Sequence, residues 1–169
     1  LTRRQREWKL DALLSTGDEN SEIYQLNQKG EATLSKDGGY LVERALELYK
    51  KTDGAFDIAI YPVMQAWGFP TQEYHVPDKD TLKEKLTLAD ASKVNYDKDT
   101  RKISFDRDGM EIDLGGIAKG YTSAQIMQIY QDCGVTSGLV NLGGNVQALG
   151  CKTDGNKWKV AIQSPDDTK

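Results

Sequence analysis

The sequence predicts an α+β fold, with helices in the first half of the chain and a largely antiparallel sheet in the second. Apolar residues recur at helical spacing within residues 39–51, where Leu41, Ala45 and Leu48 share one face. Short segments joined by turn-forming residues follow from residue 93 onward, as expected for hairpins. The chain has 169 residues, 38% of them hydrophobic, so one domain is the default expectation, with two small lobes as the alternative.

Turn-forming and polar segments separate the helices expected in the first half. Residues 21–27 are expected to form only a short amphipathic turn, and an apolar run from Ala55 to Phe69 precedes a polar loop at 70–77. The only histidine, His75, lies in that loop with no Cys or second His nearby, so it is interpreted as a solvated side chain. The expected helices cover residues 2–14, with Trp8, Leu13 and Leu14 facing inward, 39–51 and 78–86.

The second half is expected to hold strands on either side of one helix. That helix begins after residue 113 and ends near Cys133, where Gly134 serves as its C-cap. The expected strands are 93–97 and 102–106, joined as a hairpin, then 110–113, 138–142, 145–149 and 158–162.

Charge and cysteine content limit the classes of function. The net charge of −4 argues against a nucleic acid as partner, because no basic face is available for its phosphate backbone. Cys133 and Cys151 lie too far apart for a local metal motif, and a disulfide or two isolated thiols both stay open. The sequence has no transmembrane run and no secretory hydrophobic region. Because Leu1 is not an initiator methionine, the chain is interpreted as cut from a longer protein.

One motif is more informative than the rest. It is expected to be a short strand that ends in Asp113, a turn at Gly115-Gly116, and a helix with Lys119 in its first turn. Glycines let the backbone approach a ligand, and a helix N-terminus attracts phosphate. With Asp113 and Lys119 beside it, the turn suits a nucleotide phosphate held with a divalent metal. The spacing matches neither a Walker A loop nor the dinucleotide fingerprint, and a turn that only packs closely stays open.

Other features also have purely structural interpretations. Residues 141–145 suit a hairpin turn, Gly54 suits a helix end, and Asp57 suits an N-cap. No Ser-His-Asp set, activated thiol or zinc spacing can be assembled. Any catalysis is therefore expected to depend on a metal and carboxylates, or on residues outside this chain.

Four blocks of the sequence, in this order, resemble the ApbE family, the FAD:protein FMN transferases. One block alone is weak evidence, but four in register are highly specific. The blocks are Leu14–Thr16 with Ser21–Ile23 and Leu26–Asn27, then Gly54–Asp57 ending in Trp67–Phe69, then Asp113–Gly120, and finally Leu139–Asn145.

The resemblance implies a T-fold-like α+β enzyme that binds FAD with Mg²⁺ and transfers FMN to a threonine or serine of an acceptor protein. Two alternatives stay open: a Mg²⁺-dependent pyrophosphatase that converts FAD to FMN and AMP, and a flavin-binding protein without chemistry. By position, the resemblance implies that the backbone carbonyl of Gly116 binds Mg²⁺ and that FAD is contacted by Ala55, Phe56, Asp57, Asp113 and Lys119.

The resemblance also implies a setting. The acceptor would be a flavoprotein subunit of a membrane redox complex, and the enzyme an exported lipoprotein anchored at the membrane surface. Gly17 stands where many relatives carry an aromatic residue near the flavin. Residues 1–169 are expected to be one partial domain that lacks the family's C-terminal part, which completes the metal site. We therefore expect this chain alone to bind FAD and Mg²⁺ weakly or not at all, and to lack turnover.

Overall fold

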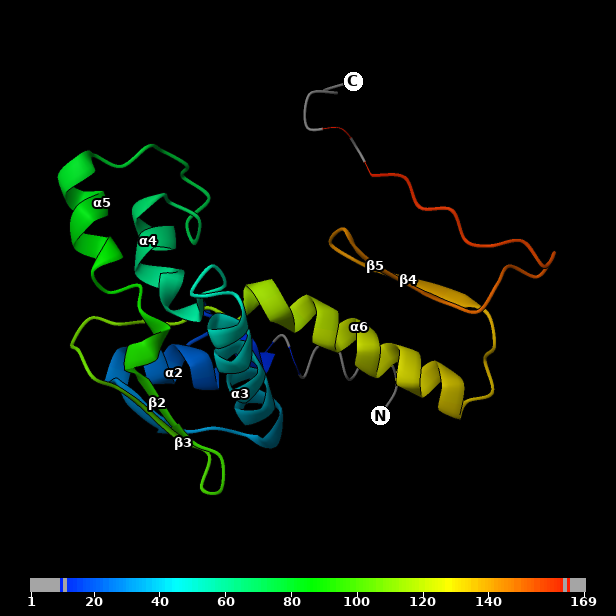
Figure 1. Ribbon diagram of the computed structural model, residues 1–169, viewed down its shortest axis with the longest axis horizontal. Coiled ribbons are helices and arrows are strands. Elements are labelled where there is room, and N and C mark those ends of the chain that lie inside the picture. The colour runs from blue at the N-terminus through cyan, green and yellow to red at the C-terminus, as the bar shows by residue number, and fades with distance from the viewer. Residues whose placement is uncertain (1–9, 11, 163, 165–169) are drawn as a thin grey trace. The chain divides into compact units, whose positions relative to one another are not determined.

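The computed structural model describes residue 10, residues 12–162 and residue 164 (Figure 1). Most of the helix expected at 2–14, including Trp8, lies outside the described residues; within them, Leu10 and Leu14 are buried. The chain divides into two compact units, one ending at Ala118 and the other beginning at Lys119. The expectation of a single partial domain stays a prediction.

The first unit is built around a three-stranded antiparallel sheet with the strand order β1-β3-β2. The central strand places Ile103 opposite both Ala32 of β1 and Tyr96 of β2, and Ile103 is buried. The elements of this unit are α2 (Glu22–Lys29), β1 (Glu31–Thr33), α3 (Lys36–Lys51), η1 (Ile58–Ile60), α4 (Tyr61–Ala66), α5 (Lys79–Leu86), η2 (Ala91–Lys93), β2 (Val94–Asp97) and β3 (Lys102–Phe105).

Two serine caps determine where the first helices begin. Ser21 accepts a hydrogen bond from the Tyr24 N–H, so residues 21–27, expected as a turn, instead begin the eight-residue helix α2. Gly30 ends α2 in the left-handed region at φ 73°. Ser35 accepts from the Gly38 N–H, so α3 begins at Lys36, three residues before the expected start.

The helix α3 lies close to the sheet because it carries glycine where the two meet. A Cβ at Gly39 would collide with the hydroxyl of Tyr96 on β2. Neither this contact nor the short strand β1 was expected from the sequence.

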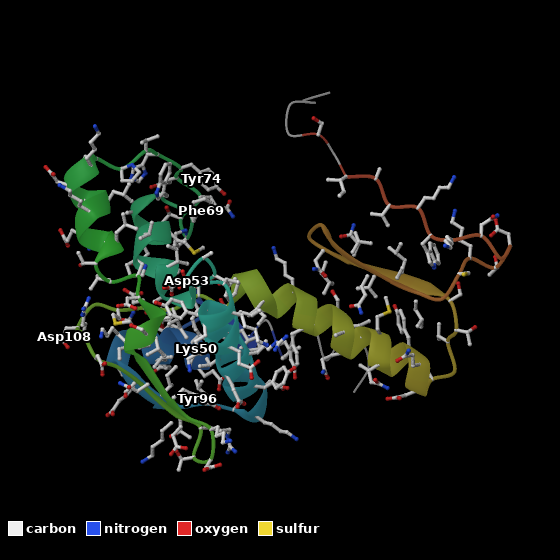
Figure 2. The ribbon with its side chains drawn as sticks, in the orientation of Figure 1. Lys50, Asp53, Phe69, Tyr74, Tyr96 and Asp108 are labelled. Carbon is white, nitrogen blue, oxygen red and sulfur yellow. The ribbon has the colours of Figure 1, made fainter. Side chains whose placement is uncertain are left out.

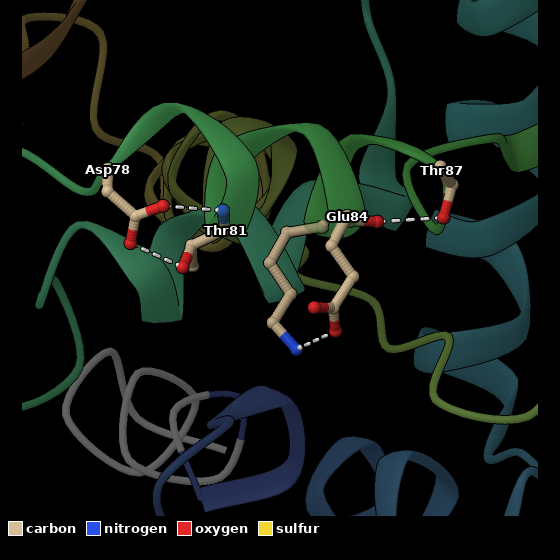
Figure 3. Close-up of polar contacts among 5 residues, drawn as sticks. Asp78, Thr81, Glu84 and Thr87 are labelled. Atoms are coloured by element: carbon tan, nitrogen blue, oxygen red, sulfur yellow. Dashed lines mark hydrogen bonds and ion pairs between the residues drawn. The ribbon is translucent and has the colours of Figure 1, made fainter.

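The helix α5 is held by caps at both ends (Figure 3). Asp78 accepts hydrogen bonds from the backbone N–H groups of Asp80 (3.0 Å) and Thr81 (2.9 Å), and from the Thr81 hydroxyl at 2.6 Å. The Thr87 hydroxyl donates to the Glu84 carbonyl at 2.7 Å. The helix expected at 78–86 is therefore confirmed, with Asp78 as its N-cap.

Residues 110–113, expected as a strand, are extended but pair with no strand of the described chain. A side chain takes the place of a partner strand: the Asn27 amide donates to the Ile112 carbonyl at 2.9 Å and accepts from the Ile112 N–H at 2.8 Å. Its side chains alternate as in a strand, because Met110, Ile112 and Leu114 are buried and Glu111 and Asp113 are less so. The strand assignment was wrong because one side chain satisfies the backbone that a ladder would otherwise pair.

The second unit contains most of α6 (Gly115–Asp132) and the antiparallel hairpin of β4 (Gly138–Leu142) and β5 (Asn145–Leu149). Its core is the cluster of Ile126, Met127 and Val140, against which Tyr130, Leu142 and Leu149 pack. The hairpin closes through Gly143 and Gly144, with φ of 54° and 89°, as a turn with two left-handed residues requires. These strands and the C-cap at Gly134 (φ 77°) were predicted.

The strand expected at 158–162 is not formed in the described chain. Val160 and Ile162 are exposed by 52% and 95%, so their alternation buries nothing. The Trp158 indole N–H donates to the Leu149 carbonyl at 3.2 Å, which ties the start of the segment to the end of β5. Among the described residues, no helix combines the length and the hydropathy needed to cross a bilayer.

Candidate functional site

The loop after α3 presents the first group of expected site residues, Ala55 to Asp57. Gly54 takes φ 80°, and its N–H donates to the Tyr49 carbonyl at 2.9 Å. The Phe56 N–H donates to the Thr52 hydroxyl at 3.0 Å. These bonds turn the chain sharply, so that Ala55 is exposed and Phe56 is half-buried.

Asp57 is fixed by two backbone groups. One carboxylate oxygen accepts from the Ala59 N–H at 2.7 Å, and the other accepts from the Ala91 N–H at 3.0 Å. The carboxylate therefore caps η1, which confirms the N-cap interpretation. The expected contact of Asp57 with FAD stays a prediction, and any such contact would share a carboxylate that already supports the fold.

The structure brings the 55–58 loop and the glycine motif together. The Asp113 N–H donates to the Ile58 carbonyl at 2.9 Å. A Cβ at Gly116 would lie 3.2 Å from Cε2 of Phe56, so the aromatic ring sits directly on the glycine backbone. Two segments more than fifty residues apart thus form one surface in the first unit.

Backbone donors at the start of α6 are largely paired within the protein. The Gly115 N–H donates to Oδ1 of Asp113 at 2.8 Å, and the N–H groups of Ile117 and Ala118 donate to the Leu114 carbonyl at 3.0 and 2.8 Å. This helix start therefore offers a phosphate fewer unpaired N–H groups than a helix N-terminus usually does. An anion here would meet the N–H of Gly116 first, with the helix dipole behind it.

Glu111 is a site neighbour that the sequence analysis did not single out. Ile112 is buried, so Glu111 and Asp113, one residue to either side, face the opposite way on the extended segment. Burial raises the pKa of the Glu111 carboxyl, and a hydrogen bond from the Gln65 amide, at 3.1 Å, opposes this rise. The alternation of Glu111, Ile112 and Asp113 was the available signal.

Lys119 belongs to the second unit, where it is exposed and lies at the β-hairpin. A Cβ at Gly143 would lie 3.8 Å from the Lys119 Nζ. The turn is stiffened by the Gly144 N–H, which donates to Oδ1 of Asn141 at 2.9 Å. The structure thus places Lys119 beside the glycine turn of the fourth sequence block.

The described residues do not make a complete metal site. They include no group of three His, Cys, Asp or Glu side chains that could hold an ion. Gly116, the expected carbonyl ligand, lies in the exposed first turn of α6. His75 is exposed, as predicted, with Nδ1 2.9 Å from the Glu73 carbonyl oxygen. Of the alternatives for Cys133 and Cys151, the structure has two free, exposed thiols.

The second sequence block ends in a structured loop between α4 and α5. Phe69 and Tyr74 project from it (Figure 2), with ring centroids 5.5 Å apart and planes at 74°. The loop closes tightly, because a Cβ at Gly68 would collide with the Glu73 carbonyl.

Sequence comparison relates the chain to the ApbE family. The ApbE family model matches residues 3–169. A FAD:protein FMN transferase of Treponema pallidum is 33% identical, over 94% of this chain and 48% of the relative. One from Klebsiella pneumoniae is 30% identical, over 90% of this chain and 48% of the relative. The chain thus spans about half the length of these relatives.

Solved structures of the same family share the fold. The ApbE protein of Thermotoga maritima matches with a TM-score of 0.88 and 26% identity, over 97% of this chain and 54% of that one. The apo form of the flavinyl transferase ApbE from Pseudomonas stutzeri matches with a TM-score of 0.84 and 26% identity, over 95% of this chain and 51% of that one. The α+β, ApbE-like fold is therefore confirmed, and the chain belongs to the ApbE family.

Proposed function

We propose that the protein containing this chain is a Mg²⁺-dependent FAD:protein FMN transferase, which cleaves FAD and attaches FMN through a phosphoester bond to a threonine or serine of an acceptor flavoprotein. The names of its relatives support this activity. The structural observation that carries the proposal is the hydrogen bond from the Asp113 N–H to the Ile58 carbonyl. It holds the family's second and third sequence blocks side by side.

Each residue of this surface has a physical part in the proposal. Phe56 offers an apolar face beside the exposed backbone of Gly116, which suits a ligand with an aromatic and a phosphate part. The α6 N-terminus favours negative charge near Gly116. Asp113 keeps the turn in shape through its bond to the Gly115 N–H.

Lys119 supplies the positive charge in this proposal. Cleaving a phosphoanhydride builds negative charge on the bridging and leaving oxygens, and a positioned ammonium stabilises it. Its position beside Gly143, a residue without a side chain, leaves the ammonium accessible.

The proposal includes Mg²⁺ because of the resemblance to the ApbE family. When bound, Mg²⁺ would neutralise phosphate charge, and it prefers oxygen ligands such as the Gly116 carbonyl. Because the described residues offer no cluster of metal ligands, we assign no step of the reaction to the metal. The setting is likewise proposed from the resemblance: an exported, lipid-anchored enzyme that acts on a flavoprotein subunit of a membrane redox complex.

One incubation separates the three candidate functions. The full natural protein is mixed with FAD, Mg²⁺ and an acceptor protein that carries a threonine, and the products are analysed by mass spectrometry and chromatography. Covalent FMN on the acceptor supports the transferase. Free FMN and AMP with an unmodified acceptor would contradict the transferase and support the pyrophosphatase. FAD that is bound but intact would support a flavin-binding protein without chemistry.

A further inference from the structure

We propose that Ser123 and Asn145 are positioning residues that hold Lys119 beside the Gly143–Gly144 turn and so set its contact with FAD. The inference rests on the proposed function, in which Lys119 contacts FAD. All five residues lie in the second unit. They come from the first half of α6, from the turn between β4 and β5, and from the first residue of β5.

The Ser123 hydroxyl joins the helix to the hairpin. Its Oγ lies 2.9 Å from the Lys119 carbonyl oxygen and 2.7 Å from Oδ1 of the Asn145 amide. Ser123 is fully buried, at 0% exposure, although serine is usually found at the surface. A buried hydroxyl held at both of these distances is fixed in orientation.

Counting protons gives the direction of these bonds. A hydroxyl has one proton to donate, and the Lys119 carbonyl can only accept. In the structure the atom that faces Ser123 Oγ is Oδ1 of Asn145, to which the hydroxyl donates. Turning the amide by 180° would let its NH₂ group donate to Ser123 Oγ while the Ser123 O–H donates to the Lys119 carbonyl. The orientation of an asparagine amide is assigned from its hydrogen bonds, and the turned one satisfies both contacts. The result is a chain of bonds from Asn145 through Ser123 to Lys119.

This chain fixes the two parts that hold the ammonium in place. It anchors the backbone of Lys119, one helical turn before Ser123, and it anchors Asn145, the first residue after the glycine turn. The Lys119 Nζ lies 3.8 Å from the position of a Cβ at Gly143. A lysine side chain loses considerable rotamer freedom when it is ordered. If the helix and the turn beside Lys119 are already fixed, less of this freedom remains to be lost when FAD binds.

The alternative is that Ser123 only satisfies a buried polar position. Both interpretations predict some loss of stability when its hydroxyl is removed. They differ in whether removing the Ser123 hydroxyl also weakens FAD binding by displacing Lys119. A cycle that combines Ser123→Ala with Lys119→Ala tests this difference, because coupling appears only if one residue acts through the other.

The experiment measures the dissociation constant for FAD, by quenching of flavin fluorescence, and FMN transfer to the acceptor in the full natural protein. We expect Ser123→Ala and Asn145→Ala each to raise this constant about 3- to 10-fold, the effect of one lost hydrogen bond. In the Lys119→Ala background, Ser123→Ala should change it less than about 2-fold. Gln128→Ala on the exposed face of α6 is the control, and it should leave FAD binding unchanged.

Two results would overturn the inference. If Ser123→Ala and Asn145→Ala leave FAD binding unchanged, the bond chain does not position Lys119. If Ser123→Ala weakens FAD binding equally with and without Lys119, its role is only structural. Asn145 is exposed, so its variant is expected to fold even where Ser123→Ala does not. Wild-type protein that binds FAD but transfers no FMN contradicts the proposed function instead, and the cycle still decides the inference.

Discussion

Asn27 offers the sharpest test of how the glycine motif is held in place. Its amide pairs with both backbone groups of Ile112, a residue 85 positions away and 0% exposed. Asn27→Asp keeps the shape of the side chain but removes the NH₂ donor. A carboxylate oxygen would then face the Ile112 carbonyl oxygen across the 2.9 Å now spanned by the amide. We expect this variant to destabilise the first unit strongly.

The magnitude follows from the two groups affected. One hydrogen bond is lost, at about 0.5–1.5 kcal/mol, and a buried carbonyl is left without a donor, at about 1–3 kcal/mol. The free energy of unfolding should therefore fall by about 2–4 kcal/mol near neutral pH. The loss should shrink as the pH falls toward about 4, because the carboxyl, destabilised when ionised, becomes protonated in the folded protein above its ordinary pKa and can again donate to the carbonyl of Ile112.

Urea unfolding followed by circular dichroism at neutral and acid pH measures this change. Gln28→Glu is the matched control, because it makes the same amide-to-carboxylate change at an exposed position of the same helix. The control should stay within about 0.5 kcal/mol of wild type. Equal free energies for the two variants, or a loss in Asn27→Asp that does not shrink in acid, would refute the role given to Asn27.

Three further predictions concern other parts of the chain. Asp57→Ala should lower the free energy of unfolding by about 1–3 kcal/mol in urea, because two backbone N–H groups lose their acceptor; an unchanged value would contradict its capping role. The pKa of Asp78 is lowered, chiefly by the Thr81 hydroxyl, so its stabilisation of α5 is present above the ordinary aspartate pKa and lost as the pH falls through the lowered one. The protection of the α5 amides from hydrogen exchange, taken relative to their intrinsic exchange rates, should fall over that range in wild type but not in Asp78→Asn. Cys133 and Cys151 are exposed thiols, so both should react with a thiol reagent without denaturant, whereas a disulfide would leave neither reactive.

Local chemistry made much of the fold predictable. Helix caps such as Asp78, the glycines of the β4–β5 turn and the alternation around Ile103 all act on near neighbours, so their patterns can be read from short stretches. The errors came from distant partners. The segment ending at Asp113 has the alternation of a strand, but its backbone is paired by the side chain of Asn27, which no local pattern reveals.

The candidate site likewise has residues that could be predicted from the sequence and residues that could not. Resemblance located Phe56, Asp113 and Gly116, and the structure brings these three residues onto one surface. The resemblance included Asn27 in its first block without giving it a role, and it did not indicate Ser123, because both act by binding backbone atoms or another side chain, which leaves no characteristic spacing in the sequence. Such supporting residues become visible only once the chain is folded.

Amide hydrogen exchange of the full natural protein, with and without FAD and Mg²⁺, tests the central claim most directly. The account predicts slower exchange at residues 55–57 and 113–119 when FAD is bound, because the ligand covers the backbone around Phe56 and Gly116. The helix α5, which has no part in the proposed site, should exchange at the same rate in both states. Bound FAD that leaves both segments unprotected and slows exchange elsewhere would contradict the account.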